Sequence, residues 1–134
     1  MTDLDTLDCA PSLLNNWGVK DFQNMLFRVA VREVEAWLLA DRDGFANYLN
    51  LPLAKTPQHP EQEVDPKQSL LGLVRRCKKR RLVEELVPTN GSSASIGPLY
   101  NKRMGEFVRD TWNITRAAEN SDSLARAVSR ISSF

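Results

Sequence analysis

The sequence predicts a mostly helical protein with a small α/β part, made of one or two strands and about six helices. Two observations predict this fold class. Residues 26–41 form the most apolar stretch, and its pattern changes midway from a β-branched run to the spacing of a helix. In most of the chain that follows, apolar side chains recur at helical spacing, and four of the seven prolines fall together in residues 51–66.

The length and composition are those of one globular unit. The chain has 134 residues, which predicts a single domain over residues 1–134. Hydrophobic residues make up 42% and charged residues 26%, ordinary values for a soluble globular protein. The net charge is +1, so the overall charge does not indicate a nucleic acid or an anionic membrane as a partner. Such a partner has to be inferred from local clusters of charge.

The cysteines, the histidine and the apolar runs argue against several kinds of site. One disulfide between Cys9 and Cys77 is arithmetically possible, but reduced thiols in a cytosol are favoured. His59 is the only histidine, which argues against a zinc site of the usual Cys/His kind. The first residues are acidic and no apolar run approaches ~20 residues, so we expect no signal peptide, no membrane span and a cytoplasmic protein.

Two acids stand close together at the N-terminus. Residues 2–4 are a candidate for a second short strand, and in an extended segment Asp3 and Asp5 point to the same side. Two neighbouring carboxylates are a natural ligand pair for a hard cation such as Mg²⁺. The alternative is a solvated acidic tail.

The run over residues 26–31 predicts a strand buried on both faces, because it is apolar except for Arg28 and rich in β-branched side chains. From Arg32 the pattern predicts a helix. Glu33 and Glu35 follow the junction, and Glu35 projects onto the apolar side of that helix. A carboxylate there has to be neutralised, hydrogen-bonded, paired or bound to a metal. The alternative to a site is an ion pair with a basic residue such as Arg28 or Arg32.

The other helices are predicted from their apolar faces and their end signals. Residues 51–66 predict a proline-rich loop, and residues 89–95 predict a flexible loop between helices. Asp65 is the predicted cap of the helix that follows it, and Ser121 or Asp122 caps the last one. The predicted helices cover residues 11–17, 43–50, 67–80, 82–87, 97–112, 114–119 and 121–131.

The predicted helix over residues 67–80 has an apolar face and a basic face. Six of the seven residues 75–81 are basic. Arg75, Arg76 and Lys79 lie opposite the apolar face and are candidates for contacts with nucleic-acid phosphates. The alternative is a solvated helix end, where cations are favoured near the negative pole of the helix dipole.

Taken in order, several motifs carry a family resemblance that covers almost the whole chain. They are DLDTLDCA, FRVAVREVEAWLLADRDGF, DPK, RRCKKRR, IGPLYN and NSDSLARA, which begin at residues 3, 27, 65, 75, 96 and 120. This pattern resembles domain-of-unknown-function family 4276. That family groups bacterial Toprim-like proteins related to the OLD nucleases and to RloB-type abortive-infection proteins. VREVEAWLLAD is the most specific piece of the resemblance.

The resemblance implies roles for the acidic candidates. In Toprim domains, a Glu after the first strand and a DxD after a later strand bind Mg²⁺ for phosphodiester chemistry. Asp3 and Asp5 match the DxD, Glu35 matches the acid of an E-x-W-L-L motif, and Glu33 is a nearby second candidate for a catalytic acid. The resemblance therefore implies a site for Mg²⁺ or Mn²⁺, which would activate water and offset charge on a phosphate.

The resemblance also implies that part of the Toprim domain is missing upstream of Met1, because its first strand and Glu have no match. Residues 1–45 would be the C-terminal Toprim-like portion, and residues 46–134 a helical family-specific extension. The alternatives are a truncated reading frame, a fragment, a split protein completed by a partner, and a dimer that covers the exposed sheet edge.

Three functions follow from these expectations. The leading one is the C-terminal part of a Toprim-like, Mg²⁺-dependent nuclease or phosphoesterase of a phage-defence system, with nucleic acid as substrate and an ATPase as partner. The second is a non-catalytic helical interaction module that self-associates. The third is a nucleic-acid-binding module without chemistry, which dimerises or completes a partner.

Overall fold

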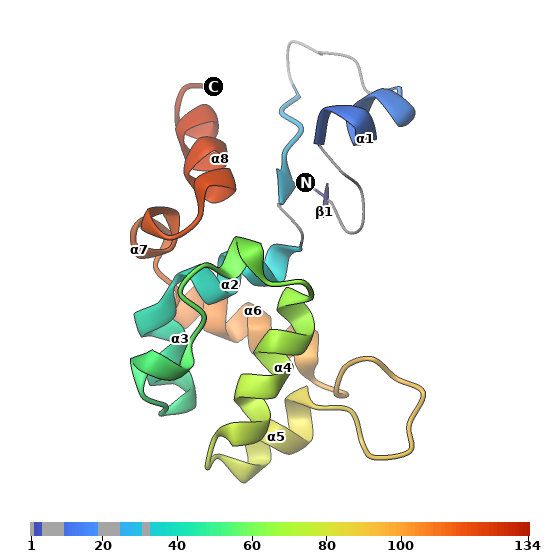
Figure 1. Ribbon diagram of the computed structural model, residues 1–134, viewed down its shortest axis with the longest axis vertical. Coiled ribbons are helices and arrows are strands. Elements are labelled where there is room, and N and C mark those ends of the chain that lie inside the picture. Colours follow the sequence, from blue (N-terminus) through green and yellow to red (C-terminus); the bar gives the residue numbers. More distant parts are fainter. Residues whose placement is uncertain (1, 4–9, 19–24, 31–32) are drawn as a thin grey trace.

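The computed structural model describes residues 2–3, 10–18, 25–30 and 33–134. This part of the chain is mostly helical (Figure 1), as the sequence predicts. In chain order the elements are β1 (Thr2–Asp3), α1 (Ala10–Asn16), β2 (Val29–Ala30), α2 (Val34–Ala40), α3 (Arg42–Leu49), η1 (Leu53–Lys55), η2 (Pro60–Gln62), α4 (Pro66–Arg76), α5 (Arg80–Leu86), α6 (Tyr100–Asp110), α7 (Ile114–Glu119) and α8 (Asp122–Ser132).

A short parallel pair of strands forms the α/β part. β1 and β2 place Thr2 opposite Val29 and Asp3 opposite Ala30. β2 is shorter than the strand predicted over residues 26–31, and the prediction that this run is buried on both faces is wrong. Of its described residues, only Ala30 is fully buried. Within the described chain β2 has β1 as its neighbour on one side, so the residues before Val29 have no sheet to cover them.

Helix α2 is the most enclosed helix of the described chain. It begins after Glu33, whose extended backbone (φ −140°, ψ 160°) marks the end of the preceding segment. Six of its seven residues, from Glu35 to Ala40, are buried. A helix that is buried on nearly all sides has to pack against neighbours on more than one side. In this protein its two sides belong to two different apolar clusters.

The two apolar clusters hold the helices together. The larger one joins α2, α3, α4, α5 and α6, and in it the rings of Phe45 and Phe107 meet edge to face with centroids 5.3 Å apart. The smaller one joins β2, α2, α7 and α8 and contains Trp37 and Leu124. In Figure 1 α3, α4 and α5 lie below α2, and the strands and α8 lie above it. Since α2 belongs to both clusters, the portions predicted on either side of residue 45 share their core.

The basic run is divided between two helices, so the single helix predicted over residues 67–80 is wrong. α4 starts as predicted, with Asp65 as its cap, but it ends at Arg76 because Cys77 has an extended backbone (ψ 151°). On one continuous helix, Cys77 and Leu82 would point about 140° apart. The break between α4 and α5 lets both side chains pack into the larger cluster.

Other predictions of local structure agree only in part: α6 is shorter than the helix predicted over residues 97–112, and the proline-rich loop predicted over residues 51–66 contains the short helices η1 and η2. Ser121 caps α8, and its Oγ accepts a hydrogen bond from the Leu124 amide at 3.2 Å. Residues 89–95 form an exposed loop, and His59 is exposed. The buried Cys77 has a free thiol, whereas Cys9 lies outside the described residues. None of the helices that the structure describes combines the length and apolar character needed to cross a membrane.

Candidate functional site

The Glu35 carboxylate is buried, with 7% of the residue exposed, and two groups from distant helices satisfy it. The Tyr100 hydroxyl donates to its Oε1 at 2.9 Å, and the Lys67 ammonium lies 3.6 Å from the same oxygen. The prediction that this acid must be hydrogen-bonded or paired is therefore confirmed. Its basic partner among the described residues is Lys67 at the start of α4. Arg28, one of the two partners considered from the sequence, instead donates to the Phe27 carbonyl at 2.9 Å.

Glu33 is held by the same lysine. Its Oε2 accepts from the Lys67 backbone amide at 3.0 Å, and its Oε1 accepts from the Lys67 ammonium at 3.4 Å. The amide belongs to the first turn of α4, where backbone N–H groups have no partner inside the helix and favour a negative charge. Glu33 and Glu35 therefore share one ammonium, and together they fix the start of α4 against the start of α2.

Tyr100 remains a hydrogen-bond donor throughout the pH range in which the protein would work. Burial is the main cause that raises its pKa far above the ordinary value, and the Glu35 carboxylate raises that pKa further. A phenol that does not ionise cannot act as a general base at neutral pH. Its hydrogen bond to Glu35 indicates that Tyr100 holds this carboxylate in place.

As they lie, the described carboxylates do not fit a metal site. The Lys67 ammonium occupies the space near Glu33 and Glu35 that a bridging cation would need. Among the described residues, no group of three His, Cys, Asp or Glu side chains is placed to hold an ion. Asp3 is described only as the β1 residue opposite Ala30, and Asp5 lies outside the described residues. Of the four carboxylates that the sequence predicts for the site, the structure therefore describes the contacts of two, Glu33 and Glu35.

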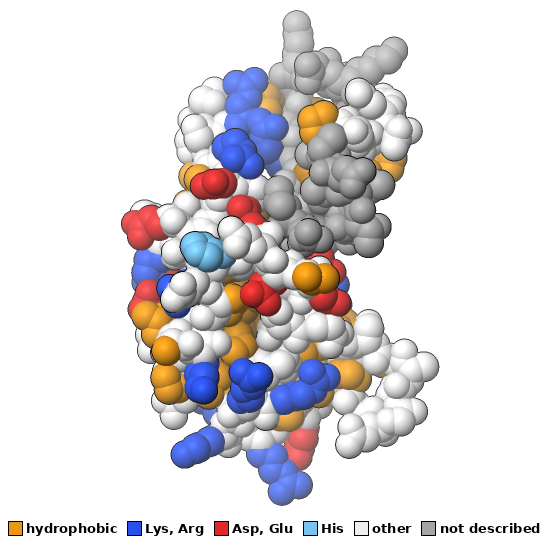
Figure 2. Space-filling model, viewed as in Figure 1, with side chains coloured by type: hydrophobic (Ala, Val, Ile, Leu, Met, Phe, Trp, Pro, Cys, Tyr) orange, Lys and Arg blue, Asp and Glu red, His pale blue; other side chains and the backbone are white. Residues whose placement is uncertain are grey.

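The basic candidates lie at the opposite end of α4. Figure 2 shows Lys and Arg side chains gathered over the lower end of the molecule, where α4 and α5 lie. Arg75, Arg76 and Lys78 are exposed, and their side chains form no ion pair or hydrogen bond within the described chain. We call these three residues the basic surface. Its cations can therefore meet an anion without giving up an existing contact.

Lys79, the third predicted phosphate contact, is already engaged. Its ammonium donates to the Tyr48 backbone carbonyl at 2.5 Å and lies 5.8 Å from the centre of the Tyr48 ring. The contact ties the start of α5 to α3. Two further cations of the run, Arg80 and Arg81, pair with Glu84 and Glu85, each at 2.9 Å. The basic run thus separates into paired cations on α5 and unpaired cations around the end of α4.

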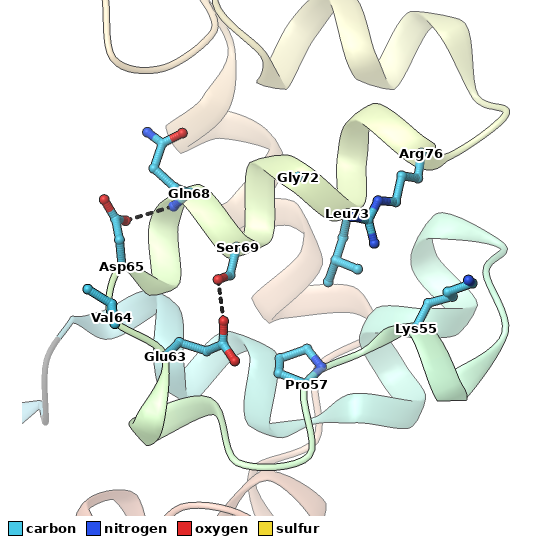
Figure 3. A pocket seen from close by; sticks show the side chains of 10 residues that line it. All are labelled: Lys55, Pro57, Glu63, Val64, Asp65, Gln68, Ser69, Gly72, Leu73 and Arg76. Atoms are coloured by element: carbon cyan, nitrogen blue, oxygen red, sulfur yellow. Dashed lines mark hydrogen bonds between the residues drawn. The ribbon is translucent and has the colours of Figure 1, made fainter.

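A groove of about 590 Å³ runs along α4, between that helix and the proline-rich loop (Figure 3). Lys55 and Arg76 lie at one end of it, and Glu63 lies towards the other. Leu73 and Pro57 line its middle. The sequence indicated no role for Lys55, because the contact between the loop and α4 has no signal in the spacing of residues. The other residues that line the groove are Val64, Asp65, Gln68, Ser69 and Gly72.

The chain was compared with protein-family models, with curated proteins and with solved structures, and nothing in the three comparisons matches it. The function of this chain is therefore inferred from its described side chains.

Proposed function

We propose that this chain binds the backbone of a nucleic acid through the basic surface at the end of α4. The observation that carries this proposal is that Arg75, Arg76 and Lys78 are exposed together and unpaired within the described chain. Lys55 extends the positive charge across one end of the adjoining groove. Such a cluster attracts phosphates even though the net charge of the chain is only +1.

The local charge explains why a polyanion is the ligand that fits this surface. The negative pole of the α4 dipole favours cations at this helix end, but this effect accounts only for the two or three cations nearest the last turn. Here the cations continue beyond the helix, from Arg76 across the groove to Lys55. Phosphates repeat along a nucleic acid, so successive phosphates can meet successive cations and release their counterions. Arginine adds a planar fork that matches a phosphate.

The test is the affinity of the purified chain for a fluorescent oligonucleotide, measured by anisotropy at low salt. Replacing Arg75 and Arg76 together by alanine should weaken binding about tenfold or more. The matched control replaces Arg126 and Arg130, which are exposed and unpaired within the described residues, lie on α8 and change the net charge equally. The control variant should bind almost as the parent chain does. Equal losses in both double variants, or no binding at all, would refute the proposal.

A second candidate function is the C-terminal part of a Toprim-like, Mg²⁺-dependent nuclease. The observation that favours it is the parallel pairing of β1 with β2, because parallel strands end at the same edge of a sheet. Asp3 lies on β1 opposite Ala30, and Glu33 and Glu35 follow β2 in sequence. The carboxylate pair and the basic surface are at the two ends of α4, about 14 Å apart along its axis. A nucleic-acid strand bound at one end of α4 would extend towards the other end.

Direct metal binding tests this second candidate without relying on activity. If the acids form a metal site, calorimetric titration with Mg²⁺ or Mn²⁺ should detect binding that is lost in Asp5→Asn. The affinity should rise in Lys67→Gln, because the competing ammonium is gone. No binding at millimolar metal in the parent chain and in Lys67→Gln would reject the site. Nucleic-acid binding that persists in that case, without cleavage under any divalent ion, would identify the chain as a non-catalytic module.

A further inference from the structure

We infer that the groove along α4 is a subsite for one unpaired nucleotide and that it favours a base with an exocyclic amino group. This inference rests on the proposed binding of a nucleic-acid backbone and adds the form of nucleic acid and the preferred base. It comes from the distribution of charge along the groove, where cations and a carboxylate stand at opposite ends (Figure 3).

The phosphate belongs at the basic end. Lys55 comes from η1 and Arg76 from the last turn of α4, and the two side chains flank the same end of the groove. Both are exposed, and neither forms an ion pair or side-chain hydrogen bond with any residue that the structure describes. A phosphate between them would take hydrogen bonds from an ammonium and a guanidinium together. The Glu63 carboxylate repels a phosphate at the other end, so the nucleotide can enter in one orientation only.

The base belongs in the middle of the groove. Leu73 and Pro57 line it there and give an apolar wall for the face of a base. The groove of about 590 Å³ has the size of an ordinary small-molecule site. A base stacked and paired inside a duplex cannot leave the stack to enter such a groove without the cost of unpairing. The subsite therefore favours a single strand over a duplex.

The Glu63 carboxylate gives the base preference. Its Oε2 accepts a hydrogen bond from the Ser69 hydroxyl at 2.5 Å, whereas its Oε1 has no partner within the described chain. The Ser69 contact fixes the carboxylate at the groove, and the free oxygen can accept one more hydrogen bond. The N4 amino group of cytosine is such a donor, whereas uracil presents a carbonyl oxygen at the same position. At this position a carboxylate attracts the amino group of cytosine and repels the carbonyl oxygen of uracil.

The experiment compares oligo(dC) with oligo(dU) of equal length by fluorescence anisotropy, because these bases have the same size and differ only at position 4, amino or carbonyl, and in the hydrogen on N3. The parent chain should bind oligo(dC) about five- to tenfold more tightly than oligo(dU), and both more tightly than a duplex. Glu63→Gln should reduce this ratio to below about twofold, because the amide offers both a donor and an acceptor. Glu63 is half-buried, and its side chain forms a hydrogen bond only with Ser69 among the described residues, so the variant is expected to fold.

Lys55→Gln should weaken binding of both oligonucleotides about equally, since a phosphate contact carries no base information. Lys102→Gln, an exposed lysine on α6 away from the groove lining, is the matched control and should change neither affinity. Equal affinity for oligo(dC) and oligo(dU), or tighter binding of the duplex, overturns the subsite. If that equal binding is still lost in the Arg75 and Arg76 double variant, the proposed function stands without the subsite. No binding of any oligonucleotide overturns both.

Discussion

The charge state of Glu85 is set by two arginine neighbours. Its carboxylate accepts two hydrogen bonds from Arg103, at 2.5 and 2.9 Å, and one from Arg81 at 2.9 Å. The contact with Arg103 is the main cause that holds the pKa of Glu85 at about 2, below its usual 4.5. Because α5 carries Glu85 and α6 carries Arg103, the ionised carboxylate joins the two helices across the exposed 89–95 loop.

The lowered pKa of Glu85 predicts how the free energy of unfolding depends on pH. A carboxyl whose pKa is lower in the folded protein stabilises the fold fully above pH 4.5, and that contribution is lost as the pH falls towards 2. Urea denaturation of the parent chain and of Glu85→Gln between pH 7 and pH 3 measures it. The parent should lose more stability on acidification than the variant does.

The exposed neighbour Glu84, which pairs only with Arg80 among the described residues, gives the matched control. Glu84→Gln should follow the pH dependence of the parent chain, because an exposed ion pair between flexible side chains contributes little. If Glu85→Gln and the parent lose the same stability between pH 7 and pH 3, the Glu85 contacts do not stabilise the folded state as described.

At the scale of the elements, Asp41 joins the turn between α2 and α3 to the start of α7. The side chain is fully buried. Its Oδ1 accepts from Arg116 Nε at 2.8 Å and from the Gly44 amide at 3.1 Å, and its Oδ2 accepts from Arg116 Nη2 at 2.9 Å and from the Asn113 amide at 2.7 Å. Burial alone would raise the pKa of this carboxyl, but the hydrogen bonds outweigh burial and hold the pKa below its usual value.

Asp41→Ala should therefore lower the free energy of unfolding by about 3 kcal/mol, because the Gly44 and Asn113 amides lose their acceptor and Arg116 loses its partner. Urea denaturation at pH 7 measures the change. Asp43→Ala, at an exposed position in the first turn of α3, is the control and should cost less than about 1 kcal/mol. A loss below about 1 kcal/mol in Asp41→Ala as well would mean that the hydrogen bonds of Asp41 do not hold α7 in place.

The helices were predictable from sequence where their own residues determine them. Asp65 before Pro66 marks the start of α4, and Ser121 marks the start of α8, because a cap and its helix are neighbours in the chain. The break at Cys77 was not predictable in the same way. It depends on Cys77 and Leu82, which both pack into a cluster that other helices complete. The residue spacing within 67–80, taken alone, fits a continuous helix.

At the candidate site, the sequence predicted the kind of interaction that Glu35 makes but not the residues that provide it. An acid at Glu35 on an apolar helix side had to be satisfied, and the structure satisfies it with Tyr100 and Lys67. Both partners lie far along the chain, so no local pattern could have identified them. Lys55 was missed for the same reason, since only the packing of the loop along α4 brings it to the same end of the groove as Arg76. Contacts distant in sequence are fixed by the packing of the whole chain.

At the scale of the whole molecule, negative and positive side chains lie at opposite ends of α4. The two carboxylates, with their shared ammonium, stand at its start, and the basic surface stands at its end. Figure 2 shows a second group of basic side chains over α8, at the other end of the molecule. If binding depended on net charge, both groups would contribute equally. If it depends on the arrangement of the cations at α4, only the basic surface and Lys55 matter.

The salt dependence of oligonucleotide binding separates these two cases most directly. The logarithm of the affinity for a single strand should fall linearly with the logarithm of the salt concentration. Removing Arg75 and Arg76 together should make that slope less steep by about 1.4, because two phosphate contacts are lost. The Arg126 and Arg130 double variant should keep the slope of the parent chain. Equal slopes in the parent and the two double variants would contradict the proposal that the end of α4 binds the nucleic-acid backbone.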